Sequence, residues 1–127
     1  MTHTNLVTRL IECWNTGKLD DIDNLLSLDF VRHEPEMGGG TTGKKEYKQT
    51  VNRYRNSLSD FHTEATDMVE QGNKIVFRFK TTGKRGNAPF IFEGVNILRI
   101  EGGKIVEDWV YFDATAVRSV VARAQTA

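Results

Sequence analysis

The spacing of the hydrophobic residues changes once along this chain, near Ser57, and this change constrains the fold more than any other feature. Before it, apolar residues recur three or four positions apart, as on one face of an amphipathic helix. After it, apolar and polar residues alternate, as in strands with one buried face. The sequence therefore predicts an α+β fold in which helices come first and a sheet follows.

Three helices are predicted before the change. Leu6, Leu10 and Trp14 mark the first, with Thr4 as a candidate N-cap. Gly17 follows where a C-terminal cap glycine belongs. The other elements predicted here are a short helix around Ile22–Leu26, a strand over Phe30–Glu34, a glycine-rich loop over Met37–Gly43 and a helix carrying the apolar stripe Tyr47, Val51, Tyr54 and Leu58.

Four strands are predicted after the change, separated by turns that contain glycine. The predicted strands are Phe61–Glu70, Lys74–Thr82, Phe90–Ile100 and Lys104–Phe112, with a short helix over Ala114–Ala124 at the end. The connection at Gly102-Gly103 is so short that the last two strands must pair antiparallel. We expect three helices packed in an antiparallel sheet that curls around them to bury their apolar stripes.

Composition narrows the class of protein. The chain has 127 residues, about the length of one domain, so we expect a single domain over residues 1–127. Seventeen basic and seventeen acidic residues give a net charge of zero, which argues against nucleic acid and anionic membranes as partners. The longest apolar run, Trp109–Phe112, is far too short to span a bilayer. With one cysteine, Cys13, and no signal-peptide pattern at the start, we expect a cytoplasmic protein.

Known cofactor motifs are missing from the sequence, which has no phosphate-binding loop, dinucleotide fingerprint, metal-ligand pattern or nucleophile elbow. We therefore expect neither a metal nor an organic cofactor. Asp113 is the first candidate for catalysis because it ends the last predicted strand on the parity of Trp109 and Tyr111. A carboxylate among aromatic groups has a raised pKa and can exchange protons near neutral pH. The alternative is that Asp113 caps the final helix.

Two further polar residues are candidates for the same site. Asn96 lies on the parity of Phe92 in an apolar strand, where it is either a satisfied core amide or a donor to a ligand oxygen. In the simplest hairpin at Gly102-Gly103, Asn96 would lie opposite Trp109, and Phe92 opposite Asp113. His33 lies at the end of a predicted strand, just before the glycine loop. It is either a solvated residue or a functional one.

Two segments, CWNTGKLDDI at residues 13–22 and GGKIVEDWVYFD at residues 102–113, resemble the SnoaL-like polyketide cyclase family of the nuclear transport factor 2 superfamily. The resemblance runs from the first helix to Asp113, with the expected elements in between. It implies a cone-shaped α+β barrel, in which a strongly curved sheet wraps around three helices and encloses a ligand cavity. It also implies assembly as a homodimer or a larger homo-oligomer.

The resemblance further implies a reaction. The family's cyclases close a ring by intramolecular aldol condensation without a cofactor, using an aspartate as general acid and base, and by position that aspartate is Asp113. Asn96 stands where these enzymes have an assisting histidine, and His33 stands where they have an asparagine. The loop at residues 83–89, which is often longer in the family, makes a poorer lid here and favours a different substrate.

Two functions from different classes follow. The first is a cyclase or isomerase of a polyketide-like or terpenoid carbonyl compound, with Asp113 as acid and base and with His33 and Asn96 polarising oxygen. The second is a non-catalytic domain that binds a hydrophobic small molecule or a partner protein. The residues expected to line the ligand pocket are Trp14, Tyr54, Phe92, Trp109 and Tyr111; Trp14 and Tyr54 are otherwise core residues.

Overall fold

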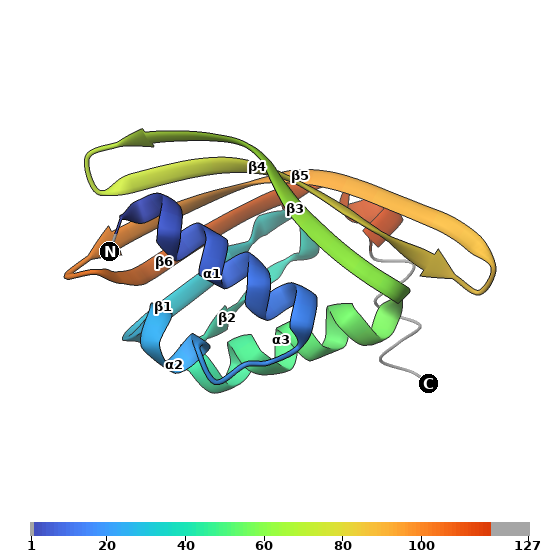
Figure 1. Ribbon diagram of the computed structural model, residues 1–127, viewed down its shortest axis with the longest axis horizontal. Coiled ribbons are helices and arrows are strands. Elements are labelled where there is room, and N and C mark those ends of the chain that lie inside the picture. The colour runs from blue at the N-terminus through green and yellow to red at the C-terminus, as the bar shows by residue number, and fades with distance from the viewer. Residues whose placement is uncertain (1, 118–127) are drawn as a thin grey trace.

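The computed structural model describes residues 2–117, and Figure 1 shows its arrangement. The elements follow in the order α1 (His3–Thr16), α2 (Ile22–Leu25), β1 (Leu26–Glu34), the 3-10 helix η1 (Pro35–Met37), β2 (Gly39–Thr42), α3 (Gly43–Ser57), β3 (Ser59–Gln71), β4 (Lys74–Arg85), β5 (Ala88–Glu101) and β6 (Lys104–Phe112). The α+β class is as predicted, with α1 and α2 at the start and the four strands β3–β6 after α3. No helix among these residues has the length and apolar content needed to cross a membrane.

The strands form one curved sheet in the order β2-β1-β6-β5-β4-β3. Neighbouring strands are antiparallel except β1 and β6, which run parallel. The sheet is therefore mixed, which corrects the prediction of a purely antiparallel one. A parallel pair needs a long crossover, and α3 with the four strands β2, β3, β4 and β5 supplies it between β1 and β6.

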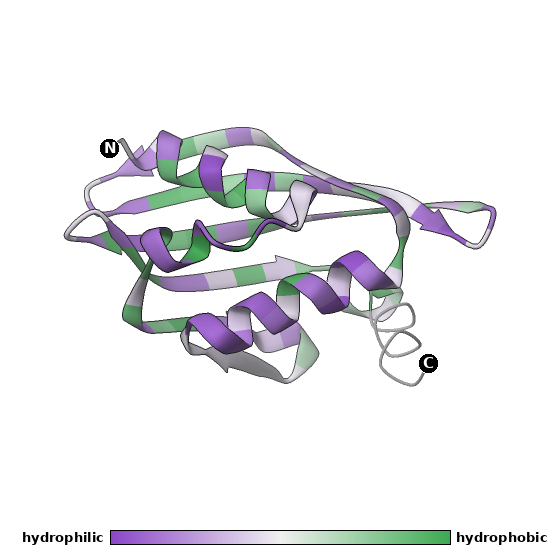
Figure 2. Ribbon diagram, turned by 60° about the horizontal axis from the view of Figure 1, so that its bottom comes forward, coloured by the Kyte–Doolittle hydropathy of each residue, from purple (hydrophilic) through white to green (hydrophobic). Residues whose placement is uncertain are grey.

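The three α-helices lie on one side of the sheet, and the core is between the two layers (Figure 1). Figure 2 shows hydrophobic and hydrophilic positions alternating along the strands. On the helices, the two kinds of position lie on different faces. The largest fully buried side chains come from both layers: Leu6, Val7, Ile22, Leu25, Tyr47 and Val51 from the helices, and Leu26, Phe30, Ile75, Leu98, Ile105 and Val110 from the sheet. Burial of these side chains is the main source of stability.

The helix boundaries follow the predicted signals closely. Gly17 ends α1 in the left-handed region, with φ of 72°, as predicted. The N-cap is Thr2 instead of Thr4, because the Thr2 hydroxyl accepts the Asn5 backbone N–H at 3.1 Å. Residues 114–117 form a helical turn after β6, and the rest of the predicted final helix, residues 118–124, lies outside the described residues.

The glycine-rich segment is not the loop that was predicted. Gly39–Thr42 forms β2 and pairs antiparallel with the end of β1. At Gly40 an added Cβ would overlap the carbonyl oxygen of Arg32, so glycine permits the close approach of the two backbones. The high glycine content thus allows strand pairing here instead of preventing it.

An extra residue in β6 decides which side chains face the helices. Lys104 pairs with Glu101 as in the simplest hairpin, but the register shifts beyond Ile105, and Glu107 pairs with Arg99. Val106 is the extra residue, and a shift of one position exchanges the two faces of a strand. Asp108, Val110 and Phe112 consequently face inward, and the predicted pairing of Asn96 with Trp109 is wrong, since Asn96 lies opposite Val110.

Candidate active site

A cavity of about 50 Å³ lies between the helices and the concave face of the sheet. Its walls are mainly apolar and aromatic. They comprise Leu10, Ile11, Trp14, Tyr47, Tyr54, Phe61, Phe77, Phe79, Phe92, Val110 and Phe112, together with the polar residues Arg32, Thr63, Thr81 and Asn96. Ile11, Trp14 and Phe61 are partly exposed, so solvent reaches the cavity between α1 and β3.

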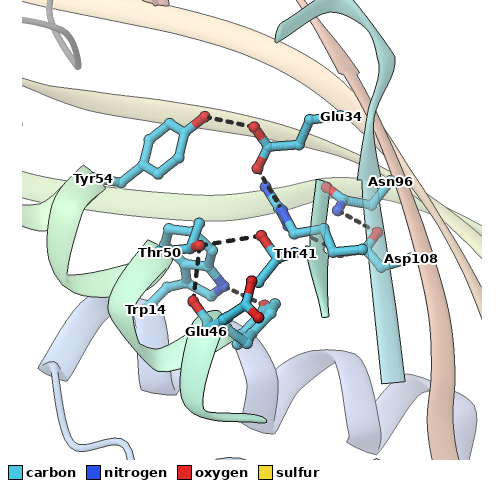
Figure 3. Close-up of polar contacts among 10 residues, drawn as sticks. Trp14, Glu34, Thr41, Glu46, Thr50, Tyr54, Asn96 and Asp108 are labelled. Carbon is cyan, nitrogen blue, oxygen red and sulfur yellow. Dashed lines mark hydrogen bonds and ion pairs between the residues drawn. The ribbon is translucent and has the colours of Figure 1, made fainter. Parts of the chain in front are cut away.

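Figure 3 shows the polar side chains of Glu34, Tyr54, Asn96 and Asp108 close together at this cavity. Arg32 is hydrogen-bonded to two of them and is the centre of the group. It lies on the inner face of β1, as does Glu34 two residues later, and it pairs in register with Asp108 of β6. Its Nε donates to Oε1 of Glu34 at 2.8 Å, and its Nη1 donates to Oδ2 of Asp108 at 2.9 Å. The three side chains are at most 7% exposed. A guanidinium group is thus buried between two carboxylates.

Asn96 and Tyr54 complete this group, which we call the polar cluster: Arg32, Glu34, Asp108, Asn96 and Tyr54. Asn96 of β5 donates through Nδ2 to Oδ1 of Asp108 at 2.8 Å. Tyr54 of α3 donates its hydroxyl proton to Oε2 of Glu34 at 3.4 Å. Arg32, Asn96 and Tyr54 line the cavity, so they are the members that a ligand would touch.

Burial sets the electrostatics of the polar cluster. It raises the pKa of Asp108, although Arg32 and Asn96 oppose this effect. Burial, followed by the nearby charge of Glu34, also raises the pKa of Tyr54. Burial alone would lower the pKa of Arg32, but Asp108 and Glu34 outweigh it and keep the guanidinium charged. With both carboxylates ionised, the cluster carries a net charge of minus one.

Aromatic side chains from two helices hold Arg32 from the other side. Trp14 of α1 donates its indole N–H to the hydroxyl oxygen of Tyr47 of α3 at 2.8 Å. The guanidinium carbon of Arg32 lies 5.6 Å from the Trp14 ring centroid and 5.8 Å from that of Tyr47. Cation–π contacts of this kind are strongest where water is excluded. The position of Arg32 is therefore fixed by ion pairs on one side and rings on the other.

The sequence-predicted site residues divide into two groups. Trp14, Tyr54, Phe92 and Asn96 all line the cavity. The cavity lining does not include Trp109, Tyr111 or Asp113. The expectation that these three residues share one face with Asn96 is therefore wrong. The register shift at Val106 turns all three outward. Asp113 is exposed, and its Oδ1 accepts the Ala116 backbone N–H at 3.3 Å, as the capping alternative predicts.

His33 also lies on the outer face of the sheet. Its Nε2 is 2.7 Å from Oε2 of Glu107, and its ring stacks on Trp109 with centroids 5.2 Å apart. Its side chain is 37% exposed. His33 therefore does not share the cavity with Asn96.

Arg32, Glu34, Asp108 and Tyr47 are site residues that the sequence interpretation missed. One signal for the first two was available. Arg32 and Glu34 share the parity of Phe30, so the predicted strand carried two charges on its apolar face. Charges in such positions are buried only when they are paired, and this points to a functional or structural cluster.

Comparison with known proteins shows the family to which the chain belongs. Residues 4–119 match the family described as SnoaL-like polyketide cyclase. The chain belongs to this family. It is 27% identical over 125 residues to the aklanonic acid methyl ester cyclase of Streptomyces peucetius, a match that covers 85% of this chain and 83% of that enzyme. It is 28% identical over 118 residues to the nogalonic acid methyl ester cyclase of Streptomyces nogalater, with 84% and 88% covered.

Solved structures show the same architecture for this SnoaL-like protein. A protein from Catenulispora acidiphila with a ketosteroid isomerase-like fold, in complex with trimethylamine, has a TM-score of 0.80 at 19% identity, with 95% of each chain covered. A nuclear transport factor 2-like protein from Cytophaga hutchinsonii has a TM-score of 0.72 at 21% identity, with 91% of this chain and 93% of that chain covered. The expected nuclear transport factor 2-like fold is confirmed.

Proposed function

We propose that this SnoaL-like protein is a cofactor-free cyclase or isomerase that moves protons on a polyketide-like or terpenoid carbonyl compound. One observation carries the proposal: two carboxylates and a guanidinium group are buried together behind an aromatic cavity that Tyr54 and Asn96 line. Buried charges are costly and are more frequent at functional sites than in ordinary cores. The distant homology to polyketide cyclases agrees with this chemistry.

The acid and base in this proposal is Tyr54 with Glu34 behind it. The Tyr54 oxygen takes a proton from the carbon next to the ligand carbonyl while its own hydroxyl proton passes to Oε2 of Glu34. The C–H bond breaks, and its electron pair moves to the carbonyl oxygen as an enolate. After the carbon skeleton rearranges, the proton returns by the same route. The concerted transfer avoids a free Tyr54 phenolate, which its raised pKa disfavours.

The remaining members of the polar cluster position these groups. Asp108 accepts hydrogen bonds from Arg32 and Asn96, which fixes both donors at the cavity wall. In this proposal Asn96 keeps its predicted place at the cavity wall, where it holds Asp108 instead of polarising the ligand oxygen. The acid and base role passes from Asp113 to Glu34 and Tyr54 because Asp113 is exposed and caps the following turn.

Deuterium exchange into the methyl group of acetophenone, followed by NMR in D₂O, tests the proposal. We expect the wild-type protein to catalyse the exchange and Glu34→Gln to lower the rate by about 10²- to 10⁴-fold. Glutamine keeps the size of the side chain and still accepts from Arg32, so acetophenone binding should persist. A wild-type protein without exchange activity would favour the non-catalytic binding domain instead.

We also propose a homodimer that forms through the outer face of the sheet. Ile91 of β5 and Tyr111 of β6 are 57% and 40% exposed on the described part of the chain. Trp109, two residues before Tyr111 on the same face of β6, stacks on His33. Large exposed apolar side chains on one face are typical of association surfaces. Sedimentation analysis of Ile91→Lys tests this. A dimeric wild type that becomes monomeric supports the proposal, and a monomeric wild type contradicts it.

A further inference from the structure

Two hydrogen-bond donors at the cavity wall are left over by the contacts described above. The Tyr47 hydroxyl accepts from Trp14, but no residue among 2–117 accepts its own proton. Arg32 uses Nε and Nη1 on the two carboxylates, and its Nη2 has no described acceptor in the same range. Tyr47 is 0% and Arg32 5% exposed, and both line the cavity.

Donors that face a cavity and have no acceptor in the protein are available to a ligand, because polar groups away from bulk water are satisfied in the large majority of cases. Here the two donors belong to neighbouring side chains, since the guanidinium carbon of Arg32 lies 5.8 Å from the Tyr47 ring centroid. The rest of the wall near them is aromatic. A ligand with a single oxygen acceptor would satisfy both donors and bury its apolar part against the rings.

The charges of the polar cluster select among such ligands. A cation such as an ammonium group would lie against the guanidinium group of Arg32, and it offers no acceptor to either donor. An anion would add a third negative charge to those of the buried carboxylates Glu34 and Asp108, of which Arg32 balances only one. An uncharged carbonyl compound meets neither penalty.

We infer that the cavity binds an uncharged ketone, whose oxygen accepts hydrogen bonds from the Tyr47 hydroxyl and from Nη2 of Arg32. This inference rests on the proposed function, because the same donors would hold the enolate that the reaction forms. When the substrate proton reaches Glu34 through Tyr54, the negative charge moves from the Glu34 carboxylate to the ligand oxygen. The total charge of the site stays constant, and the new oxyanion lies against donors that are already in place.

Four one-ring probes test the inference: acetophenone, α-methylstyrene, benzoate and benzylammonium. α-Methylstyrene replaces the carbonyl oxygen of acetophenone by a methylene group and keeps its shape. We expect acetophenone to bind at least about fivefold more tightly than α-methylstyrene, and Tyr47→Phe to remove about this factor for acetophenone alone. Tighter binding of benzoate or benzylammonium than of acetophenone would overturn the inference.

The infrared carbonyl stretch of bound acetophenone gives a readout that needs no variant. Two donors on the oxygen should lower its frequency below the value in an apolar solvent, and Tyr47→Phe should recover part of the difference. An unshifted frequency in the wild-type protein overturns the inference whatever the exchange rate is. A shifted frequency without any deuterium exchange would retain the oxygen site and overturn the proposed reaction, so the two failures are distinguishable.

Discussion

Arg32 and Asp108 lie side by side on the parallel strands β1 and β6, with Nη1 of Arg32 2.9 Å from Oδ2 of Asp108. Their side chains are 5% and 1% exposed. Glu34 adds a second carboxylate to the same guanidinium group. The consequences of removing each partner therefore differ, because only Arg32 balances the negative charges.

Replacing Arg32 should destabilise the protein strongly. Arg32→Met keeps much of the side-chain volume but leaves two buried carboxylates without their counter-charge, and we expect a loss of about 3–5 kcal/mol. Asp108→Asn is the matched control, since it leaves one cation and one anion and keeps an acceptor for Arg32. Urea denaturation at pH 7 measures both. Equal losses in the two variants would contradict the charge balance described here.

The pH dependence of Asp108→Asn follows from the raised pKa of Asp108. The folded state holds the Asp108 proton more tightly than the unfolded state does, so this group lowers the free energy of unfolding as pH rises above about 4, the ordinary range for aspartate. Asparagine does not titrate. We therefore expect the stability of Asp108→Asn relative to wild type to increase between pH 4 and pH 7. A difference that decreases over this range would show that the Asp108 pKa is lowered instead.

Cys13 should be unreactive in the folded protein. The residue is 3% exposed on α1, and its burial raises the pKa of the thiol to about 11. The thiolate is the reactive form, so iodoacetamide at pH 8 should label Cys13 only after unfolding in urea. Mass spectrometry before and after denaturation measures the labelling. Rapid alkylation of the native protein would show that α1 opens away from the sheet.

Gly94 should tolerate no side chain. An added Cβ would overlap the carbonyl oxygen of Tyr111 and lie 2.7 Å from atoms of the Phe79 ring. Overpacking of this kind costs about 1–3 kcal/mol, so Gly94→Ala should lower the thermal unfolding temperature. Gly39→Ala is the control, because nothing lies within 4 Å of its added Cβ. Similar stability of the two variants would contradict the close contact between β5 and β6.

Local signals in the sequence were sufficient for most of the fold. The bounds of β6, Lys104–Phe112, are those predicted, because alternation and a glycine turn are both encoded within the segment. The pairing of β1 with β6 was not predicted, since it joins residues far apart in the chain. The mixed sheet depends on long-range contacts between strands, and hydrophobic periodicity carries no information about such contacts.

The candidate site was predicted less well, and one residue explains most of the difference. Val106 shifts the register by one position, so Asp108 replaces Trp109 on the inner face and Asp113 turns outward. A bulge of this kind has no local signature in the hydrophobic pattern. Asn96 was placed at the cavity because its strand, β5, carries no such shift on the side that pairs with β4.

The most direct test of the central claim is the acetophenone exchange rate in two variants measured side by side. Tyr54→Phe removes the hydroxyl that contacts Glu34, and Asp113→Asn changes only the exposed cap. We predict a loss of about 10²-fold or more for Tyr54→Phe and an unchanged rate for Asp113→Asn. Full activity in Tyr54→Phe together with loss in Asp113→Asn would contradict this account and return the acid and base role to Asp113.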